Sequence, residues 1–202
     1  FHYAPMIAIA FSGIAFGFLA DRIGRKYTIL IGLGLFAVSC FLFALGDYFE
    51  FFVGLLLISG CAIGIFKTGA LALIGDISTS SREHTRTMNT VEGFFGVGAI
   101  IGPAIVAYLL AAKVSWIYLY IFAGFICLLL IVIAARVNYP RHKPCTTQEK
   151  IDIKRTLKMI RNPYAAGFSG AIALYVATEV AIYVWMPTLL KEYSGSATWF
   201  AT

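Results

Sequence analysis

Three side chains in the middle of one long apolar run could carry out proton chemistry. Glu179 lies near the centre of residues 164–190, and Tyr175 and Tyr183 stand four residues before and after it. Residues four apart share a side of a helix, so two phenols would flank one carboxyl. At that depth the carboxyl is too far from either membrane surface to snorkel. We therefore expect it to face a polar cavity and to take up a proton under some working conditions. Permanent pairing with a lysine such as Lys67, or a purely solute-binding role, are the alternatives.

Lys67 is a second candidate, within the apolar run at residues 51–75. It lies three residues after Gly64 and seven after Gly60, on the same face of a helix. A lysine at this depth either snorkels toward the inner surface or lines a water-filled cavity. The sequence therefore predicts a solute-binding set of Lys67, Tyr175, Glu179 and Tyr183.

Two further features lie in the run at residues 90–112. Glu92 is close to the inner end of this run, and we expect it to pair with a cation of the preceding loop such as Arg86. Gly98, Gly102 and Pro103 provide small residues and a kink, and their predicted role is helix packing.

Other kinds of chemistry have little support. The sequence shows no paired carboxylates, no Ser/His/Asp set, no Gly-rich phosphate loop and no metal-ligand spacing, so we predict no enzyme activity, no metal and no cofactor. The composition is 60% apolar and only 13% charged, which excludes ordinary soluble domains and nucleic-acid-binding proteins. The residues above must therefore be held by membrane-spanning elements.

The spanning elements are helices. Six apolar runs have about the 20 residues that a helix needs to cross a bilayer. They are continuously apolar, whereas barrel strands alternate over about 10 residues. The fold class is thus all-α, a polytopic membrane helix bundle with six transmembrane helices. The runs are residues 4–20, 27–46, 51–75, 90–112, 116–136 and 164–190.

Lys and Arg residues set the orientation of the bundle. Thirteen of the 16 lie in three alternate loops, at residues 21–26, 76–89 and 136–163. Positively charged loops stay on the cytoplasmic side, so these three loops are predicted to lie inside and both ends of the chain outside. The expected location is the cell membrane, inner or plasma.

The first inside turn carries the most specific motif. Residues 17–26 read Gly-Phe-Leu-Ala-Asp-Arg-Ile-Gly-Arg-Lys, which resembles the signature loop G-x-L-A-D-R-x-G-R-K of the major facilitator superfamily. In physical terms Gly17 would permit close helix approach, Gly24 a tight turn, and Asp21 hydrogen bonds from a helix N-terminus. The resemblance implies a gating role for Gly17, Asp21, Arg22, Gly24, Arg25 and Lys26.

The resemblance also implies a domain organisation. Family transporters have twelve spans in two halves, and the signature loop joins spans two and three. The chain would then be part of a longer protein, with most of the N-terminal half in 1–136, a cytoplasmic linker in 137–163 and the start of the C-terminal half in 164–202. Within the linker, a capping box at residues 146–149 and a basic amphipathic pattern predict a helix on the lipid head groups; a partner-binding helix is the alternative.

Function is inferred from two weaker resemblances. Tyr175-Val-Ala-Thr-Glu179, with Trp185-Met-Pro187 after it, is similar to span seven of the fucose/glucose-galactose:proton symporters. Residues 98–103 match half of the family's antiporter signature. The favoured function is secondary active transport of a small polar solute, a sugar, by proton-coupled alternating access. The alternatives are a proton-driven exporter of drug-like molecules and a receptor or scaffold without flux. The expected partners are a small-molecule solute, protons and membrane lipids, and no nucleic acid.

Overall fold

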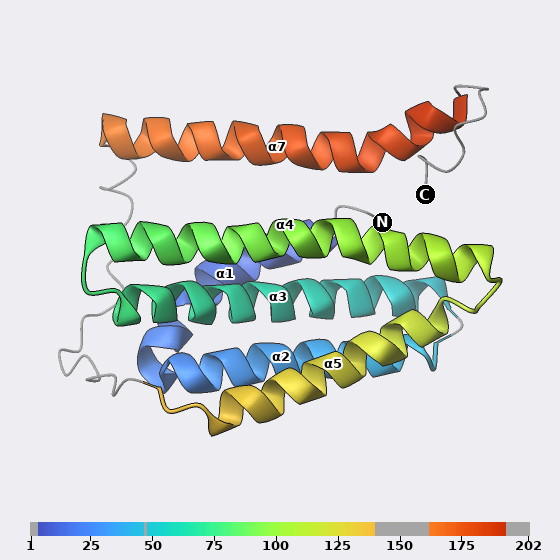
Figure 1. Cartoon of the computed structure of the whole chain (residues 1–202), viewed down its shortest axis with the longest axis horizontal. Coiled ribbons are helices and arrows are strands. Elements are labelled where there is room, and N and C mark those ends of the chain that lie inside the picture. Colours follow the sequence, from blue (N-terminus) through green and yellow to red (C-terminus); the bar gives the residue numbers. More distant parts are fainter. Residues whose placement is uncertain (1–3, 47, 140–161, 193–202) are drawn as a thin grey trace. The chain divides into compact units, whose positions relative to one another are not determined.

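The computed structural model describes residues 4–46, 48–139 and 162–192, which form α-helices and, within these ranges, no β-strand (Figure 1). The chain divides into two compact units, residues 1–146 and 147–202. The first unit contains α1 (Ala4–Ile23), α2 (Arg25–Phe43), α3 (Phe49–Ile77), α4 (Ser81–Ala111) and α5 (Ile117–Arg136), and the second contains α7 (Pro163–Glu192).

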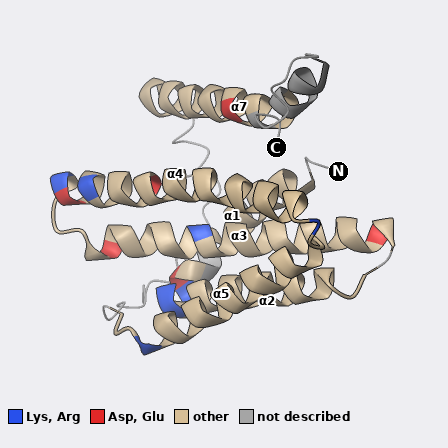
Figure 2. Ribbon diagram, turned by 45° about the vertical axis from the view of Figure 1, so that its right-hand side comes forward, with Lys and Arg blue, Asp and Glu red and all other residues tan. Residues whose placement is uncertain are grey.

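The predicted membrane spans are confirmed as long apolar helices. Four whole helices, α2 to α5, and residues 163–182 of α7 are long and apolar enough to cross a bilayer, and α1 meets the same test as a bent pair of segments. Most of the charged residues lie near the helix ends, and a few lie further inside α3, α4 and α7 (Figure 2). The all-α polytopic bundle is therefore the observed fold.

Glycines bring the helices of the first unit close together around α3. A Cβ at Gly32 of α2 would lie 2.6 Å from the backbone nitrogen of Phe66 in α3. A Cβ at Gly60 of α3 would lie 2.5 Å from the carbonyl oxygen of Pro5 in α1. Helices in lipid gain little from apolar contact alone, so such backbone approaches supply the packing that holds α1, α2 and α3 together.

Aromatic rings join α2, α3 and α5 at the opposite end from the α1–α2 turn. The ring of Phe43 stacks on Tyr120 at 4.3 Å and on Phe52 at 5.8 Å between centroids. Trp116 meets both Phe52 and Tyr120 edge to face. These four rings close a cycle of contacts across three helices.

The fourth helix begins earlier than the sequence predicted. Residues 76–89 were expected to be a loop, but α4 starts at Ser81. The side chain of Ser80 accepts a hydrogen bond from the Glu83 N–H, and the Glu83 carboxylate accepts two from the N–H and hydroxyl of Thr79. This variant of a capping box stabilises a polar first turn that a search for apolar runs passes over.

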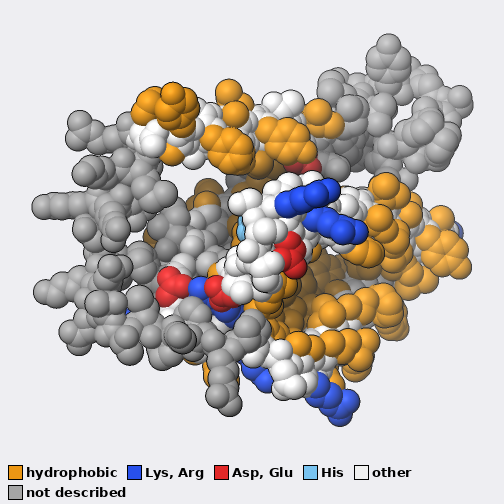
Figure 3. Space-filling view, turned by 60° about the vertical axis from the view of Figure 1, so that its left-hand side comes forward, with side chains coloured by type: hydrophobic (Ala, Val, Ile, Leu, Met, Phe, Trp, Pro, Cys, Tyr) orange, Lys and Arg blue, Asp and Glu red, His pale blue; other side chains and the backbone are white. Residues whose placement is uncertain are grey.

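Packing around α4 is sparse within the first unit. None of its residues is buried, and α5 buries only Gly124 and Cys127. Many apolar side chains are exposed, and Figure 3 shows them in orange beside a smaller number of charged side chains.

Candidate functional site

Arg25 is the centre of the candidate site, at the end of the first unit that the charge pattern predicts to be cytoplasmic. Its Nη1 donates to Asp21 Oδ1 at 2.6 Å and its Nε to Asp76 Oδ2 at 2.8 Å. The Arg25 side chain is only 12% exposed, compared with 63% for Asp21 and 32% for Asp76. The guanidinium therefore bridges two carboxylates from a partly desolvated position.

Local structure explains how three parts of the chain meet here. Gly24, with φ 90°, separates α1 from α2 in a conformation that side-chain-bearing residues rarely adopt. This turn places Asp21, in the last turn of α1, beside Arg25, the first residue of α2. Asp76 comes from the last turn of α3.

Two details differ from the sequence analysis. The Asp21 carboxylate pairs with the Arg25 side chain, and we find no bond to it from the backbone N–H groups at the start of α2. Asp76 was not proposed as a site residue. The available signal was a lone acid at the inner end of an apolar run, just ahead of Arg82 and Arg86.

Lys26 makes a separate connection. Its Nζ donates to the carbonyl oxygen of Ala135 at 2.7 Å and lies 5.7 Å from the centre of the Tyr139 ring. A cation at a helix C-terminus satisfies an orphan carbonyl and complements the helix dipole. Arg25 and Lys26, which are neighbours in the signature loop, thus contact the C-terminal ends of α3 and α5, respectively.

The other signature residues are less constrained. Arg22 is exposed, and no described atom lies within 4 Å of a Cβ placed on Gly17. Close helix approach at Gly17 is therefore not seen among the described residues. The gating role of the whole motif stays a prediction.

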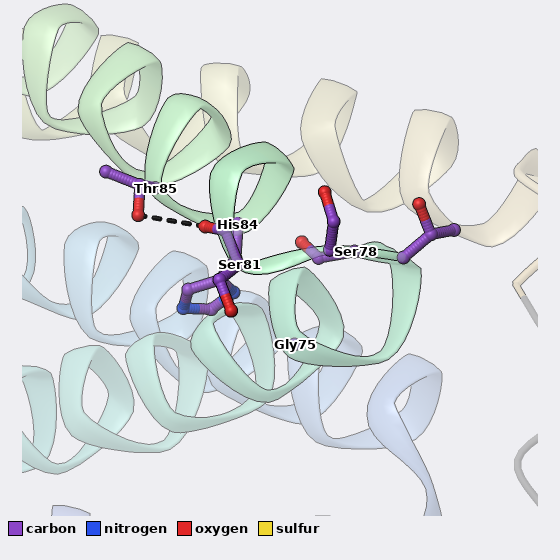
Figure 4. A pocket seen from close by; sticks show the side chains of 7 residues that line it. Gly75, Ser78, Ser81, His84 and Thr85 are labelled. Atoms are coloured by element: carbon purple, nitrogen blue, oxygen red, sulfur yellow. Dashed lines mark hydrogen bonds between the residues drawn. The ribbon is translucent and has the colours of Figure 1, made fainter.

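A shallow pocket of about 390 Å³ lies at the α3–α4 turn (Figure 4). Its lining hydroxyls already bond within the turn: Thr85 donates to the Ser81 carbonyl at 3.0 Å and Ser78 to the Ile74 carbonyl at 2.6 Å. Hydrogen bonds from Thr79 lower the pKa of Glu83, which lies ahead of the apolar part of α4. We interpret this region as a helix cap. It is lined by Gly75, Ser78, Thr79, Ser80, Ser81, His84 and Thr85.

The predicted solute-binding residues lie in both units. Lys67 is exposed on α3, whereas Gly60 and Gly64 are buried against α1. On α7, Tyr175 is exposed and Glu179 half-buried, one helical turn apart. The Tyr183 side chain lies outside the described part. Lys67 belongs to the first unit, and Tyr175, Glu179 and Tyr183 belong to the second. A joint solute-binding role of the four residues stays a prediction.

The predicted features of α4 have mixed outcomes. Glu92 forms no ion pair with Arg86: with residues 81–89 helical, six positions separate the two side chains by about 120° around the helix axis. Pro103 lies within the helix, and no described atom comes within 4 Å of a Cβ placed on Gly98 or Gly102. Helix packing by these three residues stays a prediction. The amphipathic linker helix expected at residues 146–161 lies outside the described residues.

Comparison with known proteins gives three findings. Residues 3–202 match the sequence model of the Major Facilitator Superfamily. The quinolone resistance protein NorA of Staphylococcus aureus is 32% identical over 147 residues, which make up 73% of this chain and 36% of NorA. The vesicular acetylcholine transporter unc-17 of Caenorhabditis elegans is 25% identical over 187 residues, 89% of this chain and 34% of that protein. The chain thus spans about a third of the length of either relative.

Proposed function

The chain belongs to the major facilitator superfamily, and we propose that the protein is a secondary transporter that exports drug-like organic molecules in exchange for protons. It is a multi-pass protein of the plasma membrane. The family consists of transporters, which agrees with the expectation that the protein is not an enzyme.

The similarity to NorA is the observation that carries the direction and substrate class. NorA is named for quinolone resistance, and resistance follows when a membrane protein removes a drug from the cell. The second relative is named for transport of acetylcholine, an organic cation. Neither name concerns a sugar, so these relatives give the expected sugar:proton symport no support, and the fucose/glucose-galactose branch is not confirmed. Drug export, our alternative from the sequence, has the better support.

The inner-end contacts suit a transporter that alternates between two open states. Arg25 connects the α1–α2 turn to α3, and Lys26 connects the start of α2 to the end of α5. Alternating access largely moves one rigid bundle against another. These contacts would help α1, α2, α3 and α5 to move as one body.

Transport by inside-out membrane vesicles tests the proposal. Vesicles from cells that make the full-length protein should take up a fluorescent organic cation or a quinolone when their lumen is acidified, and a protonophore should abolish the uptake. Vesicles without the protein provide the control. Proton-coupled uptake of a hexose by intact cells, with no movement of either drug-like probe in vesicles, would overturn export in favour of sugar symport.

A further inference from the structure

Two buried cysteines of the first unit lie on helices that pack against each other. Cys40 is in α2 and Cys127 in α5, with 2% and 7% of their surface exposed, and both are free thiols. A buried cysteine by itself packs like a small apolar side chain. Two thiols that meet across a helix contact can also bind a metal ion, so their relative position matters.

Both cysteines belong to the contact between α2 and α5. Gly124 and Cys127 are the buried residues of α5 and, three positions apart, share one face of that helix. A Cβ placed on Gly124 would lie 2.8 Å from Cζ of Phe41, the residue that follows Cys40 in α2. The Cys40 thiol is near enough to Cys127 and to Tyr120, also in α5, for electrostatic interaction with both. The two thiols therefore face the same contact.

The helices run in opposite directions through this contact. Near the start of α2, Lys26 donates to the carbonyl oxygen of Ala135 at the end of α5. At the end of α2, the ring of Phe43 stacks on that of Tyr120, near the start of α5, at 4.3 Å between centroids. These contacts fix the register of the antiparallel pair at both ends.

This register places the cysteines at nearly the same level. Counted from the contact of Phe41 with Gly124, Cys40 lies one residue and Cys127 three residues toward the end where α2 begins. The difference of two residues corresponds to about 3 Å along the helix axis. A side chain leans toward the N-terminus of its own helix, so in an antiparallel pair Cys40 leans toward the level of Cys127 and Cys127 toward that of Cys40.

A site with two thiols selects among metal ions. Among the residues that the structure describes, no group of three or more His, Cys, Asp or Glu side chains could hold a metal ion. Zinc, which takes four ligands in its structural sites, therefore fits poorly, and thiolates favour soft cations. A divalent cation between two thiolates gives a neutral complex, whereas copper(I) or silver(I) would leave a negative charge, which is costly inside a membrane. The mercuric ion is soft and divalent, and two sulfur ligands in linear geometry satisfy it.

We propose that Cys40 and Cys127 form a two-coordinate binding site for the mercuric ion, which joins α2 to α5. When mercuric chloride reacts, each sulfur forms one bond to the metal, and two protons and two chloride ions leave, with no change in oxidation state. Neutral mercuric chloride can reach the thiols from the lipid. This inference concerns the packing of the first unit and does not depend on the proposed export function.

X-ray absorption at the mercury edge tests the site in purified full-length protein in lipid nanodiscs. All cysteines other than Cys40 and Cys127 are replaced by alanine, and one equivalent of mercuric chloride is added. We expect one mercury per protein with two sulfur ligands and no chloride. This ligand count needs no substitution at either cysteine of the pair. Mercury should also raise the midpoint of thermal unfolding, because it binds the folded contact.

Single variants measure the contribution of each thiol. Cys40→Ala and Cys127→Ala should each weaken mercury binding by about a hundredfold or more, because the second bond forms within one molecule at high effective concentration. Mercury should then leave the unfolding midpoint unchanged. A protein that retains Cys61 and Cys127 is the matched control, since Cys61 is a half-buried thiol of α3, outside the α2–α5 contact. It should bind mercury as weakly as the variants with one thiol.

Three results would overturn the site. Two mercury ions per protein, each with one sulfur and one chloride, would show that the thiols are too far apart to share a metal. Equal affinity of the single variants and the protein with both cysteines would show that only one thiol binds. A lower unfolding midpoint with mercury would show that the metal binds the unfolded chain in preference to the α2–α5 contact.

Discussion

Arg25 has two carboxylate partners that differ in their contact with solvent, and this difference predicts unequal effects of mutation. Asp76 is half as exposed as Asp21, at 32% against 63%. Replacement by Asn keeps the shape and removes the charge. Asp76→Asn should lower the free energy of unfolding by about 1–3 kcal/mol, as expected for a bond to a charged group. Asp21→Asn, at a largely exposed ion pair, should cost below about 1 kcal/mol.

Thermal unfolding of the full-length protein in detergent measures both effects. The Glu50→Gln variant, at the other end of α3, serves as a charge-loss control. A larger loss for Asp21→Asn than for Asp76→Asn would show that Arg25 depends mainly on its partner in α1, contrary to the described geometry.

Glu179 is the residue to which we assign proton coupling, on the basis of its depth in α7. Glu179→Gln should abolish proton-driven extrusion while downhill exchange of solute continues, because the amide cannot release a proton but can still bond a solute. Thr178→Val is a matched control, since the Thr178 hydroxyl already donates to the Leu174 carbonyl of its own helix at 2.9 Å. Extrusion by Glu179→Gln with the pH dependence of the wild-type protein would exclude this role.

At the scale of the helix, glycine positions separate into close contacts and open ones. A Cβ at Gly32 would come within 2.8 Å of the Cα of Phe66, whereas one at Gly34 would meet no atom within 4 Å. Gly32→Ala should therefore force α2 and α3 apart and lower the free energy of unfolding by about 1–3 kcal/mol. Gly34→Ala should leave stability unchanged or raise it by up to about 1 kcal/mol through helix propensity.

The midpoint of thermal unfolding, measured for both variants alongside the wild type, tests this pair. Equal midpoints for Gly32→Ala and Gly34→Ala would mean that the α2–α3 contact is looser than described. The comparison is sharp because both glycines lie on one helix, two residues apart.

The membrane-spanning helices were predictable from the sequence, because a continuous apolar run of about 20 residues is typical of a transmembrane helix and of few other structures. The start of α4 was not, because its first turn is polar and depends on hydrogen bonds among Thr79, Ser80 and Glu83. Contacts between helices were harder still. Gly32 and Gly34 have similar surroundings in the sequence, and only the position of α3 distinguishes them.

The candidate site was predictable only in part, because some of its residues are close together in the sequence and others meet only in the folded chain. The turn at residues 17–26 is local, so its motif identified Asp21, Arg25 and Lys26. Their partners Asp76 and Ala135 are 51 and 109 residues away in the chain and meet the turn only after the helices pack. Local spacing contains no signal for such contacts.

At the scale of the whole molecule, the alternation of positive loops predicts which ends of the helices face the cytoplasm. Thirteen of the 16 Lys and Arg residues lie in the loops that we place inside. The charge pattern thus predicts that Arg25, with its partners Asp21 and Asp76, and the α3–α4 turn face the cytoplasm.

Cysteine labelling tests this topology in the full-length protein after its native cysteines are replaced. A membrane-impermeant maleimide added outside intact cells should label a cysteine placed at Asp47 or Ser194 but not one placed at Ser81 or Lys150. Permeabilised cells supply the control, because all four positions should then react. The positive-inside rule acts through loops shorter than about 60 residues, and the three positively charged loops are all well below that limit. Labelling of Ser81 and Lys150 alone would invert the bundle and place Arg25 and its two carboxylate partners outside.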